Sequence, residues 1–294
     1  MKEDAYMSVT LYRVSAFPYQ GTGGNEAGVV IETEHLSDND MLTIAKRVNY
    51  SETAFLLPSD KADFKLRYFT PTTEVNLCGH ATIAAFNLLR NMEIVEKKPY
   101  TIETKEGILT VIIEDERVNL QLKKPIFGKP IDKNAVIKAL NLPKDIIADL
   151  PIQTVSTGIT EIFIPLKTLK HLHELQLDEA SIMTLCQEHQ ALGLYFFTLD
   201  TKHNHDAHSR NFLSPVGIFE ESATGTAGGA LACYLQKHLY PDKTEYRFEQ
   251  GYAMFKPSQI EVTLFIKDNE IDDLYVGGKM RFIDKIVGFM PKEF

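Results

Sequence analysis

The sequence lacks the features that would place the protein in a membrane or outside the cell. No apolar run approaches the roughly 20 residues that a membrane-spanning helix needs. The opening MKEDAYMSVTLYRV carries Glu3 and Asp4 where a secretory signal would be basic and then apolar. The three cysteines, Cys78, Cys186 and Cys233, are far apart and odd in number, which disfavours a disulfide framework. We therefore expect reduced thiols, a cytoplasmic location and no membrane partner.

Basic residues are also in short supply. The chain has 31 Lys and Arg residues against 40 Asp and Glu residues, which gives a net charge of −9 at pH 7. Because an acidic surface repels phosphate backbones, we expect no nucleic-acid partner. Pro-rich, Ser-rich and repetitive linkers are missing as well. A chain of 294 residues, 44% of them hydrophobic, then predicts one large or two medium globular domains.

The two halves of the sequence begin on the same plan. Residues 36–58 combine a helix with the apolar strand AFLL, and residues 177–199 combine a similar helix with the strand LYFFTL. Ser37 or Asp38 is the expected N-cap of the first helix, and Asp178 is that of the second. The repeated order predicts a duplicated α+β unit.

Each half then continues to a glycine that precedes an apolar helix. Gly79 opens a helix expected at residues 80–91, and Gly225, 146 positions later, opens one at residues 226–238. Both helices are too apolar to lie on a surface. The surrounding strands alternate, as in FKLRYF, VNLQL and QIEVTLF, which favours antiparallel sheets with one buried face. We predict an α+β fold with two pseudo-symmetric lobes, each a curved, mainly antiparallel sheet around a central helix.

The same pattern predicts the borders of the lobes. The first lobe should contain residues 1–124 and 279–294, and the second should contain residues 125–278. The chain should return to the first lobe near Gly277 and Gly278. We expect the functional cleft to lie between the lobes.

The starts of the two central helices are candidate anion sites. The first N–H groups of a helix have no intrahelical partner, and the helix dipole favours negative charge there. His80 directly follows Gly79 at the first start, and Thr226 follows Gly225 at the second. We therefore expect these residues to bind a small carboxylate.

Ordered motifs along nearly the whole chain carry a more specific pattern. They are VSAFPYQGTGGNEAGVVI, SETAF at 51–55, FTPTTEVNLCGHATIAA at 69–85, GIFEESATGTAGGALACYL at 217–235, FEQGYAMFKPSQIEV from Phe248 and VGGKMRF from Val276. These motifs resemble the PhzF-like family, named for an isomerase of phenazine biosynthesis, although Glu26 stands where the family more often has proline. The resemblance implies the fold shared by diaminopimelate epimerase and proline racemase.

The resemblance also implies roles for particular residues. It nominates Glu52 as the carboxylate that transfers a proton and places His80 at the mouth of the first helix. Glu221 stands where the family more often has aspartate, and Thr226 where it usually has serine. These replacements bear on substrate contacts more than on the type of reaction.

A mechanism with two opposed thiols is not expected. In epimerases and racemases of this fold, two cysteines at the helix mouths act as acid and base, and Gly79 and Gly225 occupy the matching positions. Cys78 is one residue early and is expected to be a small buried side chain. We therefore expect a cofactor-independent isomerase of a small carboxylated molecule, similar to trans-2,3-dihydro-3-hydroxyanthranilate isomerase. The alternatives are a racemase or epimerase of a hydroxy- or imino-acid and a non-catalytic small-acid-binding protein.

Two other motifs are interpreted as structural. HNHDAH, at residues 203–208, has no zinc-motif spacing and is expected to be a solvated hairpin, so we expect no metal. GTGGNEAG, at residues 21–28, has Glu26 where a dinucleotide fingerprint needs its third glycine and is expected to be a turn. No cofactor is expected. Because family members are commonly dimers, we expect a homodimer.

Overall fold

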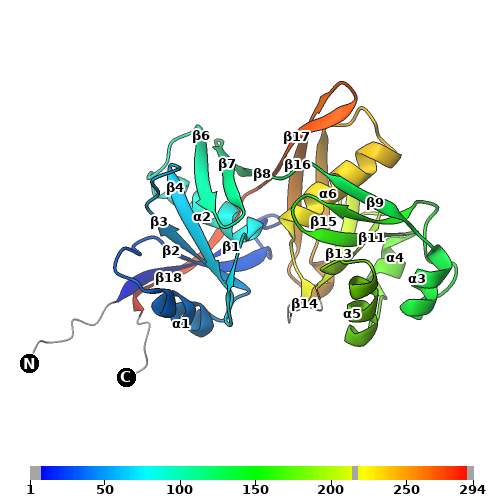
Figure 1. Ribbon diagram of the computed structural model, residues 1–294, viewed down its shortest axis with the longest axis horizontal. Helices are drawn as coiled ribbons and strands as arrows, with labels where there is room; N and C mark the ends of the chain where they lie inside the picture. The colour runs from blue at the N-terminus through cyan, green and yellow to red at the C-terminus, as the bar shows by residue number, and fades with distance from the viewer. Residues whose placement is uncertain (1–7, 214–217, 290–294) are drawn as a thin grey trace, which may run out of the picture. The chain divides into compact units, whose positions relative to one another are not determined.

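The computed structural model describes residues 8–213 and 218–289 and shows a fold of strands with few helices (Figure 1). It divides into two compact units. Unit 1 contains the described residues 8–18, 25–120 and 278–289, and unit 2 contains residues 19–24 and 121–277. The predicted α+β class is confirmed.

The elements of unit 1 are strands and two long helices. They are β1 (Val9–Ala16), β2 (Asn25–Val30), α1 (Asp38–Val48), β3 (Glu52–Leu57), β4 (Phe64–Phe69), β5 (Glu74–Val75), α2 (Gly79–Asn91), β6 (Pro99–Thr104), β7 (Gly107–Ile113), β8 (Val118–Gln121, which ends at the border) and β18 (Met280–Phe289). Most of their pairings are antiparallel, and two are parallel. The parallel pairs are β2–β3 and β4–β6. Along the chain, α1 lies between β2 and β3, and α2 lies between β4 and β6.

Unit 2 has the same order of pairings. Its elements are β9 (Ile126–Ile131), α3 (Lys133–Ala139), β10 (Ile152–Ser156), β11 (Thr160–Leu166), α4 (Leu169–His173), α5 (Glu179–Glu188), β12 (Gly193–Thr198), β13 (Ala207–Leu213), β14 (Ile218–Glu221), α6 (Gly225–His238), β15 (Glu245–Gln250), β16 (Ser258–Lys267) and β17 (Glu270–Gly278). Here the parallel pairs are β11–β12, joined through α4 and α5, and β13–β15, joined through α6. The neighbouring pairs are again antiparallel.

The helix starts follow the expected local chemistry. Ser37 caps α1 in a capping box with Asp40, and Asp178 caps α5 through the N–H of Ser181. α1 ends at Asn49, which adopts the left-handed conformation with φ 55° and turns the chain into β3. These contacts explain why the predicted caps are correct.

The central helices α2 and α6 are buried along most of their length, as predicted from their composition. In α6 the small residues permit close packing, because a Cβ on Gly229 would lie 2.3 Å from Leu122 and one on Gly228 would lie 2.8 Å from Ile260. In unit 1, Asn87 donates from α2 to the carbonyl of Gly278 at 3.1 Å. This bond fixes α2 to the strand that returns to unit 1.

The segment 19–24 belongs to unit 2, although it connects β1 and β2 of unit 1. The N–H groups of Tyr19 and Gly24 both donate to the carbonyl of Pro257, at 3.3 and 3.2 Å. Gly21, Gly23 and Gly24 all have positive φ, so the predicted turn is confirmed for residues 21–24, whereas residues 25–28 lie in β2. Its attachment to unit 2 was not expected from the sequence.

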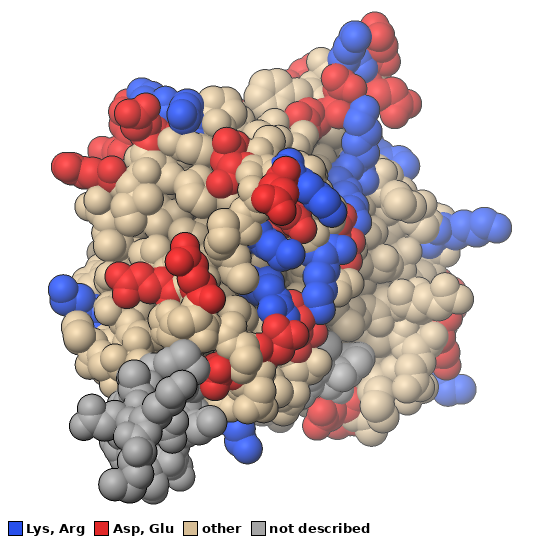
Figure 2. Space-filling model, turned by 60° about the vertical axis from the view of Figure 1, so that its left-hand side comes forward, with Lys and Arg blue, Asp and Glu red and all other residues tan. Residues whose placement is uncertain are grey.

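The surface carries charges of both signs. Figure 2 shows acidic and basic side chains interspersed over one face. Arg67, for example, contacts Asp38 at 2.6 Å and Glu74 at 2.8 Å. Among the described residues, none of the helices has both the length and the apolar character to cross a membrane.

Candidate active site

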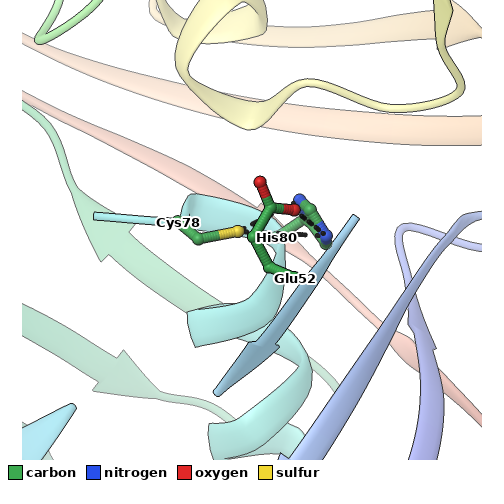
Figure 3. A group of neighbouring side chains, drawn as sticks. All are labelled: Glu52, Cys78 and His80. Carbon is green, nitrogen blue, oxygen red and sulfur yellow. Dashed lines mark hydrogen bonds and ion pairs between the residues drawn. The ribbon is translucent and has the colours of Figure 1, made fainter. Parts of the chain in front are cut away.

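The start of β3 and the start of α2 bring three reactive side chains together in unit 1. Glu52 is the first residue of β3, Cys78 is the N-cap of α2 and His80 is the second residue of that helix. Figure 3 shows the three side chains converging from the strand and the helix start. Glu52 and His80, both predicted as site residues, are therefore neighbours.

The histidine lies between the carboxylate and the thiol. Nε2 of His80 is 3.4 Å from Oε2 of Glu52, and Nδ1 is 3.3 Å from Sγ of Cys78. The hydroxyl of Ser51 is also 3.4 Å from Nε2. The His80 side chain is 4% exposed and that of Glu52 is 15% exposed, so the carboxylate is the more accessible of the two.

Oε2 of Glu52 is buried and accepts no hydrogen bond within the described part of the chain. Buried polar atoms in native proteins almost always have a partner, and exceptions concentrate where a group has chemistry to perform. The carboxylate is thus held near an imidazole without being fully satisfied. This arrangement can accept a proton from a bound molecule.

Hydrogen bonds keep the start of α2 rigid. The hydroxyl of Thr82 donates to the carbonyl of Cys78 at 2.7 Å and shares a 2.7 Å hydrogen bond with the hydroxyl of Tyr68. Burial raises the pKa of Tyr68, so this phenol stays neutral and keeps the bond. The position of His80 therefore depends on a buried network as well as on the helix.

The three ligand atoms of Glu52, Cys78 and His80 lie within 4.8 Å of one another. Carboxylate, thiolate and imidazole are all donors that zinc accepts. No metal was expected from the sequence, and no spacing motif indicates one. The same three groups also form an acid–base cluster.

The predicted residues of unit 2 lie around the start of α6. Glu221 ends β14 and is half-buried, whereas Gly225 and Thr226, the first residues of α6, are buried. The carbonyl of Thr226 accepts a hydrogen bond from Thr157 at 2.9 Å. Gly79, at the start of α2, is half-buried beside His80. The predicted residues thus form one group in unit 1 and one in unit 2.

Thr224, the N-cap of α6, and Gln250 belong to the unit 2 group but were not singled out from the sequence. The Thr224 hydroxyl donates to Oε2 of Glu221 at 2.5 Å. Gln250 accepts from the N–H of Thr224 at 3.1 Å and donates to the carbonyl of Glu221 at 2.9 Å. Both residues lie inside motifs that resemble the PhzF-like family, Thr224 in SATG and Gln250 in FEQG. Their place in these motifs was the sequence signal that could have identified them.

The expectation of a solvated hairpin at residues 203–208 holds for the exposed His203 and Asn204, between the antiparallel strands β12 and β13, but is wrong for His208. His208 is fully buried, and its Nδ1 lies 2.6 Å from Oε2 of Glu249. The reason is that β13 begins at Ala207 and pairs in parallel with β15, which places His208 opposite Glu249. The N–H groups of Lys202 and His203 donate to the same carboxylate at 2.9 and 2.7 Å.

Burial alone would raise the pKa of Glu249. The hydrogen bonds from His208 and from the two backbone N–H groups outweigh it and hold this pKa below its ordinary value. His205, 3.3 Å from the same carboxylate, has its pKa lowered by burial. The buried carboxylate of Glu249 therefore holds the loop before β13 in place through its bonds to Lys202, His203 and His208.

Comparison with known proteins identifies the family of the chain. The family model of phenazine biosynthesis-like proteins, PhzC-PhzF, matches residues 14–283. The chain belongs to this family. The resemblance inferred from the motifs is confirmed.

Relatives and solved structures agree over nearly the whole chain. The chain is 35% identical to an uncharacterised isomerase of Bacillus subtilis, YfhB, with 86% of this chain and 89% of the relative covered. It is also 35% identical to the uncharacterised isomerase YddE of Escherichia coli, with 92% and 95% covered. A crystal structure of a PhzF-family phenazine biosynthesis protein from Bacillus anthracis has a TM-score of 0.87 at 27% identity and covers 96% of this chain and 99% of that one.

The fold extends to more distant proteins. A hydroxyproline epimerase from Agrobacterium vitis has a TM-score of 0.61 at 13% identity, with 95% of this chain and 90% of that chain covered. At this identity the likeness shows the fold alone. It confirms the expected relation of the PhzF fold to the proline racemase type.

Proposed function

We propose that this PhzF-family protein is a cofactor-independent isomerase that moves a proton on a small carboxylated substrate. The observation that carries the proposal is the pairing of Glu52 with His80, in which a buried carboxylate oxygen 3.4 Å from the imidazole accepts no hydrogen bond among the described residues. The relatives are named isomerases, which supports the reaction class.

In this mechanism Glu52 works first as a base and then as an acid. The carboxylate takes a proton from a carbon of the substrate, and the electron pair of the broken C–H bond remains on the substrate. The neutral carboxyl group then returns the proton to a different carbon. Glu52 stands at the start of β3, where its side chain is partly exposed on one side and contacts the buried imidazole of His80 on the other. This position suits both steps, because the carboxyl group must gain and lose a proton without moving away.

The start of α2 supplies the first candidate site for the substrate carboxylate. The Cys78 side chain makes no capping hydrogen bond to the first turn. We infer that the first-turn N–H groups at Gly79 and His80 bind the anion, since helix starts favour negative charge. We assign Glu221, Gly225 and Thr226 of unit 2 to substrate binding as well, with Glu221 accepting from an amine or hydroxyl of the substrate.

The epimerase alternative requires two opposed thiols. Gly79 and Gly225 occupy the positions where such thiols would stand, and Sγ of Cys78 is directed at His80. The observations therefore favour one carboxylate over two thiols. We also propose a homodimer, and light scattering that returns twice the 33.3 kDa chain mass would support it, whereas a single chain mass would not.

Deuterium incorporation tests the proposed function. The protein would be incubated in D₂O with EDTA and a panel of small unsaturated carboxylic acids that includes trans-2,3-dihydro-3-hydroxyanthranilate, and incorporation at carbon would be followed by NMR. General acid–base catalysis contributes about 10²- to 10⁴-fold, so Glu52→Gln should lower the rate at least about 100-fold. Glu32→Gln, an exposed glutamate of the same unit, is the matched control and should match the wild type.

Two results would contradict the proposal. A Glu52→Gln variant that exchanges as fast as Glu32→Gln would show that another group moves the proton. Binding of an acid from the panel without any exchange in the wild type would favour the non-catalytic binding protein.

A further inference from the structure

A second buried carboxyl group lies in unit 2, away from Glu52. Glu161, the second residue of β11, is 2% exposed. Its Oε1 accepts a hydrogen bond from Nδ2 of Asn211 on β13 at 3.0 Å. Burial raises the pKa of Glu161 to about 7, and the bond from Asn211 only partly offsets this.

Two acceptors at this contact have no donor. Oε2 of Glu161 and Oδ1 of Asn211 are both buried, and neither has a hydrogen-bond partner in the described residues. The carboxyl and carboxamide groups already face each other through the bond between Nδ2 and Oε1. A proton on Glu161 would supply the missing donor, because a neutral carboxyl and a carboxamide can exchange two hydrogen bonds. The geometry therefore fits the neutral acid better than the carboxylate.

Asn211 passes this constraint to the start of α6. Its Nδ2 also donates to the hydroxyl oxygen of Thr224 at 3.0 Å, and Nε2 of Gln250 donates to the same oxygen at 3.2 Å. A hydroxyl has two acceptor positions and one proton. With both positions occupied, Thr224 is left to donate its proton to Oε2 of Glu221, 2.5 Å away. Glu221 is thereby held as a hydrogen-bond acceptor.

We propose that Glu161 is a positioning residue that, as a neutral acid, fixes the carboxamide of Asn211 and through Thr224 holds Glu221 as a hydrogen-bond acceptor. An acceptor held in this way selects substrates with a hydrogen-bond donor, an amine or a hydroxyl, in addition to the carboxylate group. The part that concerns substrate rests on the proposed role of Glu221 in binding. Ionisation of Glu161 above neutral pH removes the proton that satisfies Asn211 and loosens the network.

The groups around Glu161 do not change charge in the same range. Burial raises the pKa of Cys186 on α5 to about 11 and also raises that of Tyr195 on β12, and the charge that Glu161 carries once it ionises adds to both shifts. The Tyr195 hydroxyl bonds to Ser209 at 2.8 Å and to Oε1 of Gln250 at 3.3 Å. Glu221 is linked to Glu161 through Thr224 and Asn211. Near neutral pH, the thiol of Cys186 and the phenol of Tyr195 thus keep their protons while Glu161 titrates.

Stability against pH tests the proton on Glu161 without any substrate. A carboxyl group whose folded pKa is raised stabilises the fold below its unfolded pKa of 4.5, and this contribution is lost as the pH rises to about 7. The folded-to-unfolded ratio should fall by up to about tenfold per pH unit across that window for this one group. Urea unfolding of wild type, Glu161→Gln and the exposed α5 control Glu188→Gln would be compared at several pH values.

Glu161→Gln should remove this loss, because glutamine donates to Oδ1 and accepts from Nδ2 of Asn211 at every pH. Its stability relative to the wild type should therefore rise between acid and neutral pH, whereas Glu188→Gln should follow the wild type. Equal pH dependence for wild type and Glu161→Gln would overturn the neutral-acid assignment. This readout stands whether or not Glu52 is the catalytic group.

The positioning role is tested by kinetics with a substrate found in the deuterium assay. Glu161→Leu should raise KM at least tenfold with a smaller change in kcat, and Glu161→Gln should restore the wild-type KM and flatten its rise above pH 7. An unchanged KM in Glu161→Leu would overturn the positioning role. If Glu161→Leu does not fold, the pH dependence of KM in Glu161→Gln decides, because that variant keeps the hydrogen bonds and removes only the titration.

Discussion

Replacement of Glu249 by glutamine should destabilise unit 2 severely. The carboxylate is fully buried and accepts from His208 at 2.6 Å and from the N–H groups of His203 and Lys202 at 2.7 and 2.9 Å. Glutamine offers one oxygen instead of two, so its NH₂ group must face at least one of these donors. Hydrogen bonds to a charged group contribute about 1.5–3 kcal/mol each, and removal of one partner of a buried ion pair typically costs about 3–5 kcal/mol.

We therefore expect Glu249→Gln to lower the free energy of unfolding by about 3–5 kcal/mol, a large part of the roughly 5–15 kcal/mol of a typical domain. Urea unfolding followed by far-UV circular dichroism measures this, since the chain contains no tryptophan to report by fluorescence. Glu245→Gln, an exposed position on the same strand, should change stability by less than about 0.5 kcal/mol. A loss below about 1 kcal/mol in Glu249→Gln would refute the interpretation of this carboxylate as an anchor.

The pH dependence of the same pair of proteins gives a second check. Because the folded pKa of Glu249 is lowered, its contribution is present above the unfolded pKa of 4.5 and is lost as the pH falls below it. The stabilities of wild type and Glu249→Gln should therefore converge in acid. A constant difference down to low pH would show that the cost comes from altered packing instead of lost charge.

The remaining predictions concern the thiol and the turn. Cys78→Ala should change turnover by no more than a few-fold and should lower the free energy of unfolding by about 1 kcal/mol. The reason is that the buried thiol contacts His80 but has no opposed thiol with which to form a two-base pair. Complete loss of activity in this variant would contradict the single-carboxylate mechanism. Gly23→Ala should destabilise the protein by about 1–3 kcal/mol more than Gly21→Ala does. Both glycines have positive φ, but only a Cβ on Gly23 would lie 2.3 Å from the carbonyl oxygen of Pro257. Equal unfolding midpoints for the two variants would show that this contact relaxes freely.

Local signals in the sequence were sufficient for several elements. Ser37 and Asp178 were correct caps because a capping bond reaches only three residues along the chain. The starts of α2 and α6 were placed within one residue, at Gly79 and Gly225, because a glycine followed by a long apolar run has few other interpretations. The family motifs implied Glu52 and His80 as site residues, and their contact at 3.4 Å is a finding of the structure.

Contacts between strands that are distant in the sequence could not be predicted in this way. His208 meets Glu249 because β13 and β15 pair in parallel across α6, and nothing in HNHDAH itself indicates that partner. Likewise, no local pattern shows that the turn before β2 bonds to Pro257. These contacts depend on how distant segments of the chain are aligned with one another. In a strand pair, a shift of one residue would turn every side chain to the other face of the sheet.

The second carboxylate, Glu161, shows how a comparison of the two halves can mislead. The sequence aligns Glu52 with the region around Gly193, which offers no acid. In unit 1 the parallel pair β2–β3 places Ala27 opposite Glu52, and in unit 2 the parallel pair β11–β12 places Glu161 opposite Gly193. Both units thus carry a carboxyl group at the corresponding level of the corresponding strand pair, but on opposite strands.

This exchange of strands has a physical cause and a consequence. A Cβ on Gly193 would lie 2.6 Å from the Leu213 side chain and 2.7 Å from the Phe212 carbonyl, so this position of β12 has no room for a side chain. Glu161, on the neighbouring strand β11, is buried with 2% of its surface exposed, whereas 15% of the Glu52 side chain is exposed. A carboxyl group that must exchange a proton with substrate needs that access, and one that only orients Asn211 needs to be shielded from water. The difference in exposure therefore accounts for assigning proton transfer to Glu52 and positioning to Glu161.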